Sequence, residues 1–296
     1  MNKHKVDIVS EVSMPKRGDS LDNPLGHPKE FKLPTMEVVP GKYTNTLYSP
    51  RDITDDWKAY KDYLSEVKPA FHPHVLFVGH DSSEIENIAL MSLGGILHHM
   101  NGSANYALVG EGNINILSDI ISKKQPEWIG FNLYTGLTDY VFDWIKKYKI
   151  ERASFILKKT ISDFDTADKA LKNMVRETNG PIYDGNQIIY APVIIGGHFN
   201  NYSFEESFCK GGDYVVRGKG INILRDILLG LYSPGIYHDP MPYANIPRMD
   251  REAFFKDMYE FSDKTKGYVV SRIKSVLTAL GCSYTCSYCY ISSLID

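Results

Sequence analysis

Three cysteines near the end of the chain carry the clearest chemical signal in the sequence. Cys282, Cys286 and Cys289 stand in the run GCSYTCSYCY, so all three thiols belong to one short loop. Thiolates bind soft metals, and three of them at close spacing can hold three irons of a 4Fe–4S cube. Because such cubes usually take four cysteines, one iron stays open to the amino and carboxylate groups of a small chelating molecule. The loop therefore predicts an iron–sulfur cluster with one open iron.

Clustered cysteines also serve as zinc ligands or form disulfides. A structural zinc site takes four ligands, commonly from paired cysteines or histidines, and no histidine follows this cluster. A disulfide would leave one of the three cysteines unpaired. A zinc-stabilised interaction protein is therefore the alternative interpretation of the loop. The fourth cysteine, Cys209, stands alone and is expected in the hydrophobic core.

The spacing Cys-x3-Cys-x2-Cys, with Tyr288 directly before the last cysteine, resembles the signature of the radical S-adenosylmethionine (SAM) superfamily. The preceding run SVLTALG (275–281) is similar to the first strand of that superfamily's (β/α) barrel. This resemblance implies that Cys282, Cys286 and Cys289 ligate a 4Fe–4S cluster and that SAM binds the open iron. It also implies an electron donor such as a flavodoxin or ferredoxin. Only seven residues follow Cys289, so we expect a truncated barrel and a chain that is inactive alone.

Upstream of the cysteines, short apolar runs alternate with helical patterns. The runs read as buried parallel strands because they are short, apolar and followed by glycine or polar residues. Strands are expected at 75–79, 104–110, 127–136, 191–199 and 213–220, and helices at 84–100, 114–124, 137–148, 204–210 and 221–231. This alternation predicts an α/β fold with a doubly wound parallel sheet of the flavodoxin-like type. Residues 150–190 are expected to form an insertion with a helix at 166–178.

Glycine-containing loops follow several of these strands, where the ligand crevice of a doubly wound sheet lies. The runs VIIGGHF and DYVVRGKG resemble the second half of the cobalamin-binding domain found ahead of radical SAM barrels, and GFNLYTG resembles its third strand and loop. The likeness covers about residues 74–232. It implies cobalamin as a cofactor. The contacts it implies are Tyr134, Thr135, Gly136, Gly196, Gly197, His198, Arg217, Gly218 and Gly220.

The chain departs from that family at the loop that supplies a histidine to cobalt. Counting the family's Asp-x-His-x-x-Gly motif from Asp81 puts Ser83 in the histidine position and Glu86 in the glycine position. Lys219 also stands where the family usually has glutamate. No lower histidine ligand is therefore expected, which suits methyl transfer. The resemblance implies methyl transfer to an unactivated carbon or phosphorus centre by the full-length protein, with ring rearrangement as the alternative outcome. A non-catalytic cobalamin- or nucleotide-binding module is the other interpretation.

Proline content divides the rest of the chain. Eight of the fifteen prolines lie at or before Pro73, which indicates an irregular arm or cap over residues 1–73, ahead of the domain at 74–232. Four more prolines fall in 233–265, which is expected to be a linker to the radical SAM segment at 266–296.

Charge and hydropathy limit the partners. A net charge of -3 gives no basic face for nucleic acid, and no apolar run reaches the ~20 residues that cross a bilayer. The N-terminus lacks the apolar core of a signal peptide, so a cytoplasmic location is expected. The substrate, a small molecule or a peptide, is not identified by these residues.

Overall fold

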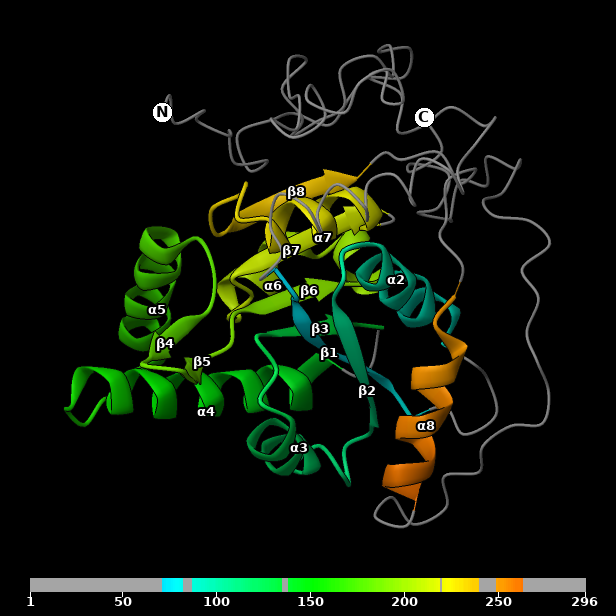
Figure 1. The fold of residues 1–296 in the computed structure, drawn as a ribbon. Helices are drawn as coiled ribbons and strands as arrows, with labels where there is room; N and C mark the ends of the chain where they lie inside the picture. Colours follow the sequence, from blue (N-terminus) through cyan, green and yellow to red (C-terminus); the bar gives the residue numbers. More distant parts are fainter. Residues whose placement is uncertain (1–70, 82–86, 135–137, 219, 240–248, 263–296) are drawn as a thin grey trace, which may run out of the picture.

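The main sheet has six parallel strands within the described residues. A computed structural model describes residues 71–81, 87–134, 138–218, 220–239 and 249–262 (Figure 1). Within these residues the strand order is β2-β1-β3-β6-β7-β8, and every neighbouring pair is parallel. The strands are β1 (His74–His80), β2 (Ser103–Val109), β3 (Trp128–Asn132), β6 (Val193–Gly196), β7 (Tyr214–Gly218) and β8 (Gly235–Asp239). The predicted doubly wound α/β fold is confirmed, with one strand more than expected.

Helices cover both faces of the sheet. Figure 1 shows α2 (Ile88–His99) and α7 (Ile221–Leu228) on one face, where they contact each other. The same view shows α3 (Ile116–Lys124) and α4 (Thr138–Leu157) on the other face. A short 3₁₀ helix, η2 (His198–Asn201), leads from β6 into α6 (Phe204–Cys209). Among the described residues, no helix combines the length and apolar character that a bilayer crossing requires.

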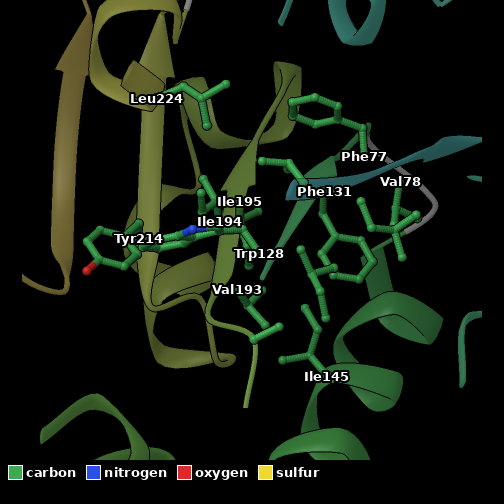
Figure 2. Packing of buried hydrophobic residues seen from close by; sticks show 14 of the residues in the cluster. Phe77, Val78, Trp128, Phe131, Ile145, Val193, Ile194, Ile195, Tyr214 and Leu224 are labelled. Atoms are coloured by element: carbon green, nitrogen blue, oxygen red, sulfur yellow. The ribbon is translucent and has the colours of Figure 1, made fainter. Parts of the chain in front are cut away.

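The core forms because the central strands carry apolar side chains on both faces. All five residues of β3 are buried, as expected of a strand covered by helices on each side. Figure 2 shows Phe131 and Val193 on the side of the sheet that faces Ile145 of α4, and Phe77 and Leu224 on the other side. This two-sided packing explains why the strands could be recognised as near-continuous apolar runs.

The expected linker at 233–265 is wrong for its described part, because that part belongs to the domain. β8 pairs along β7 at one edge of the sheet, and α8 (Arg251–Ser262) packs against β2 at the other. The carboxylate of Asp257 on α8 accepts the backbone N–H of Tyr106 at 2.7 Å and the side-chain amide of Asn105 at 2.9 Å. The first bond occupies a backbone N–H of the edge strand β2, which would otherwise be open to pairing with another chain.

Further polar contacts hold α8 in place. The Tyr106 hydroxyl donates to Asp250, just before α8, at 3.0 Å. Near the other end of the helix, Glu260 accepts from the ammonium groups of Lys123 and Lys124 at 2.9 and 2.7 Å. The hydrogen bonds from Lys124 and Lys123 lower the pKa of Glu260 to about 2. Helix α8 is therefore joined to both β2 and α3.

The expected insertion at 150–190 contains the end of α4, the helix α5 (Phe164–Thr178) and a two-stranded antiparallel hairpin. The hairpin strands are β4 (Ile182–Asp184) and β5 (Gln187–Tyr190). Asp163 begins α5 by accepting the backbone N–H of Thr166 at 2.8 Å, as N-cap residues do.

A buried charge network ties this insertion to the sheet. The ammonium of Lys149 is fully buried and lies 2.6 Å from one carboxylate oxygen each of Asp168 and Asp213. The second oxygen of Asp213 accepts the Tyr190 hydroxyl at 2.6 Å and the backbone N–H of Val193 at 2.8 Å. Since β6 begins at Val193 and β7 directly after Asp213, the network lies at the amino edge of the sheet. It is therefore a structural network, away from the edge where doubly wound sheets bind ligands.

The expectation that Cys209 lies in the core is wrong, because its side chain is exposed. Cys209 ends α6, whose buried residue is Ser207, two positions earlier. Residues two apart on a helix point to nearly opposite sides, so burying Ser207 exposes Cys209.

Candidate functional site

The carboxyl edge of the sheet has a switch point between β1 and β3. The chain passes from β1 to β2 on one side and later returns to β3 on the other side of β1, so the direction of winding reverses there. Ligands of open α/β sheets bind outside the carboxyl ends of the strands at such a point. The residues that follow the two strands are Asp81 after β1, and Leu133 and Tyr134 after β3.

A chain of amide side chains fixes the geometry at this point. The Asn132 amide donates to Oδ1 of Asn87 and to the Tyr134 hydroxyl, both at 3.3 Å. Oδ1 of Asn87 also accepts the backbone N–H of Leu90 at 3.1 Å and so caps α2. Asn132 is buried and therefore orients both the start of α2 and the Tyr134 side chain. The sequence analysis did not identify Asn87 or Asn132, since single asparagines in strands and loops carry no distinctive spacing.

Tyr134 and His198, which come from different loops, lie against each other. Their ring centroids are 5.5 Å apart and the ring planes differ by 25°, so the rings are stacked. His198 is exposed and Tyr134 is half-buried. Two predicted contact residues thus form one stacked, partly exposed aromatic surface beside the switch point.

The Gly196–Gly197 turn brings these two loops together. Gly197 has a φ of 100°, a conformation that favours glycine, and a Cβ there would lie 2.5 Å from the carbonyl oxygen of Leu133. Backbone hydrogen bonds join Leu133 N–H to Gly196 at 2.8 Å and Phe199 N–H to Leu133 at 3.1 Å. The close approach that Gly197 allows is therefore to the end of β3. This glycine builds the rim that holds His198 against Tyr134.

Asp81 adds a carboxylate to the same edge. Its backbone N–H donates to the Val109 carbonyl at 3.0 Å, while its Oδ1 atom is buried with no hydrogen-bond partner in the described part of the chain. Burial raises the pKa of Asp81, and the neighbouring His80 partly offsets this rise. Burial, with Asp81 as a further cause, also raises the pKa of Tyr140. Asp81 thus supplies an unused acceptor near the switch point.

The space enclosed at the switch point is small. A cavity of about 10 Å³ lies among side chains that include His80, Asn132, Tyr134 and Tyr140, which is room for about one water molecule. A large ligand would therefore lie on the rim formed by these loops, outside this cavity.

The predicted residues after β7 lie farther along the same edge. Gly218 has a φ of 79° and donates its N–H to Oδ1 of Asn201 at 3.1 Å. Gly220 has a φ of 73° and stands at the N-cap of α7. Arg217 is only 5% exposed, and its guanidinium lies over the Phe204 ring at 4.3 Å. β7 and η2 pack together, so Arg217 lies near the loop that carries His198.

Several predicted residues lie outside the part of the chain that the structure describes. They are Thr135, Gly136, Cys282, Cys286 and Cys289, together with Ser83, Glu86 and Lys219 of the departures from the cobalamin family. Within the described residues, no three histidine, cysteine, aspartate or glutamate side chains gather closely enough to hold a metal ion. The cluster loop therefore stays a prediction from sequence.

Comparison with known proteins gives little further guidance. No family model matches the chain, and no curated protein matches it. Among solved structures, the chain is similar to a cobalamin-binding protein from Desulfitobacterium hafniense DCB-2 at 15% identity and a TM-score of 0.30. The similarity covers 61% of this chain and 71% of that one. At this TM-score the likeness supports no conclusion about the ligand of this chain.

Proposed function

We propose that the carboxyl edge of the sheet binds a cobalamin, as the upstream module of a radical SAM enzyme. The stacked pair of Tyr134 and His198 at the β1–β3 switch point is the observation that carries this proposal. A partly exposed aromatic surface suits the broad, largely apolar ring system of a corrinoid. The runs that resemble the cobalamin-binding domain supply these two residues.

The polar atoms of the edge fit the periphery of such a cofactor. The corrin ring carries amide side chains, which both donate and accept hydrogen bonds. In the described residues, Oδ1 of Asp81 is an unpaired acceptor, and Nδ2 of Asn200 and Nε of Arg217 are unpaired donors. Buried polar atoms without partners are rare in folded proteins, so these three atoms support the proposal of a ligand whose polar groups complete their bonding.

The described residues have separate tasks in this proposal. Asn132 holds the Tyr134 hydroxyl, and the Gly197 turn sets His198 beside it, so the aromatic surface exists before the ligand arrives. Such preorganisation lowers the ordering cost of binding. A bound cobalamin would supply the reactive carbon–cobalt chemistry, while the protein positions it and excludes water.

The second half of the proposal depends on Cys282, Cys286 and Cys289. Their spacing supports a 4Fe–4S cluster with SAM at the open iron, and methyl transfer is the activity that we propose for such an enzyme.

Hydroxocobalamin titration tests the cobalamin proposal. Spectroscopic titration of the full chain is expected to show saturable binding, and Tyr134→Ala is expected to weaken it about tenfold through loss of the stacked surface. Tyr183→Ala is a matched control, because Tyr183 is 45% exposed on the β4–β5 hairpin and bonds Glu127, just before β3, at the amino edge. Absence of binding, or equal loss in both variants, would contradict the proposal.

A further inference from the structure

Arg217 is a buried cation, and the part of the chain that the structure describes holds no buried counterion for it. Arg217 is the last residue but one of β7, near the carboxyl edge, and only 5% of it is exposed. Nε is buried without a hydrogen-bond partner, and no carboxylate among the described residues pairs with the guanidinium. The guanidinium lies over the Phe204 ring, 4.3 Å from the ring centroid. Burial lowers the pKa of Arg217, but arginine stays protonated in proteins.

Asn200 supplies a second unpaired donor in the neighbouring element. It is fully buried in η2, and its Oδ1 accepts the hydroxyl of Ser207. That bond leaves Nδ2, which has no partner among the described residues. The loop of Asn200 is held to the end of β7 by the bond from Gly218 N–H to Asn201 at 3.1 Å. A buried charged donor and a buried neutral donor thus come from adjacent elements on one edge.

Buried donors such as those of Arg217 and Asn200 are suited to binding an oxyanion, which carries only hydrogen-bond acceptors. Leaving a buried donor unsatisfied destabilises the fold, and a charged donor does so more strongly, whereas an oxyanion can accept from both kinds of donor. Arginine is the side chain that favours planar, two-bond recognition of phosphate and carboxylate. Phe204, which lies against the guanidinium, and Ser207, which bonds Asn200, are both neutral.

We propose that Arg217 and Asn200 form a binding site for a phosphate group at the carboxyl edge beyond β6 and β7. Arg217 neutralises the charge of the phosphate and Asn200 donates a second hydrogen bond from the η2 side. The site stands on these two donors and does not require the Tyr134–His198 surface. Its phosphate has two chemical sources, either the phosphodiester of the cobalamin nucleotide, which would rest on the proposed function, or the phosphate of another ligand.

Calorimetric titration of the full chain with inorganic phosphate tests the site. Saturable binding is expected, and Arg217→Met is expected to weaken it at least about tenfold, because methionine keeps the contact with Phe204 but loses the charged donor. Arg152→Met is the matched control, since it removes the same charge from an arginine that also lies over an aromatic ring, Tyr148, at 5.4 Å. Its phosphate affinity should equal that of the wild type.

A second variant examines the neutral donor. Asn200→Asp keeps an acceptor for Ser207 but replaces the donor with a carboxylate, so phosphate binding should be lost. Far-ultraviolet circular dichroism checks that each variant folds, and if Asn200→Asp does not fold, the Arg217→Met comparison decides. No saturable phosphate binding by the wild type, or equal affinity in the wild type and Arg217→Met, would overturn the site.

Two corrinoids distinguish the sources of the phosphate. Hydroxocobalamin carries the nucleotide phosphate and cobinamide lacks it. If the cofactor supplies the phosphate, Arg217→Met weakens hydroxocobalamin binding but leaves cobinamide binding unchanged. If another ligand supplies it, both corrinoids bind the variant normally and only phosphate binding falls. If neither corrinoid binds the wild type, the cobalamin function fails while the phosphate titration still decides the Arg217 site.

Discussion

Replacing Asp213 with alanine is expected to lower the free energy of unfolding by about 3–5 kcal/mol, the usual cost of breaking a buried ion pair by removing one partner. Asp213 is fully buried and accepts from Lys149, the Tyr190 hydroxyl and the Val193 N–H. Its loss removes partners from all three donors, and only Lys149 retains another carboxylate, that of Asp168. Chemical denaturation followed by circular dichroism measures the change.

Two companion variants sharpen the Asp213 test. Asp184→Ala, at an exposed position in β4, should change stability by less than about 0.5 kcal/mol. Adding Lys149→Met to Asp213→Ala should recover part of the loss, because the buried ammonium is then gone. A loss below about 1 kcal/mol for Asp213→Ala would show that the network does not hold the insertion to the sheet.

Replacing Cys286 with alanine is expected to abolish the iron–sulfur chromophore under the radical SAM proposal. Anaerobic reconstitution of the full chain with iron and sulfide should give absorbance near roughly 400 nm, the usual region for such clusters. With two thiolates left on the loop, the cube loses the ligand of one iron, so the absorbance should disappear.

Cys209→Ala provides the matched control for the cluster. Cys209 is an exposed thiol on α6 and lies outside the motif, so its replacement should leave the absorbance unchanged. A chromophore that survives in Cys286→Ala would contradict the cluster assignment. Metal analysis that finds one zinc and no iron would instead select the zinc-stabilised interpretation.

The sequence predicted the centre of the fold better than its edges. The strands from β1 to β7 of the main sheet are buried on both faces, so their apolar runs were recognisable. β8 was not predicted, because it is a short edge strand, GIYHD, with a proline on either side. α8 was not predicted, because it lies in the same proline-rich region. Its packing on β2 depends on the hydrogen bond from the Tyr106 backbone N–H to Asp257. Such a long-range contact leaves no local pattern.

The site was predicted in outline, but the roles of individual residues were not. Tyr134 and His198 were expected near a ligand, and the structure brings their rings together. Gly197 was expected to contact a ligand. Instead, its positive φ lets the backbone before η2 lie close to Leu133 at the end of β3. Among the described residues, the buried donors of Asn200 and Arg217 have no hydrogen-bond partner. Which partners a buried donor finds is decided by the folded structure, so sequence spacing could not predict these two donors.

Hydrogen exchange of the full chain, with and without hydroxocobalamin, tests most directly whether the carboxyl edge is the ligand site. The account predicts slower amide exchange in peptides that cover residues 79–81, 132–134 and 196–201 when the corrinoid is present. Exchange at the amino edge, in residues 190–193, should stay unchanged. Protection at the amino edge, or binding without protection of the three loops, would contradict the assignment.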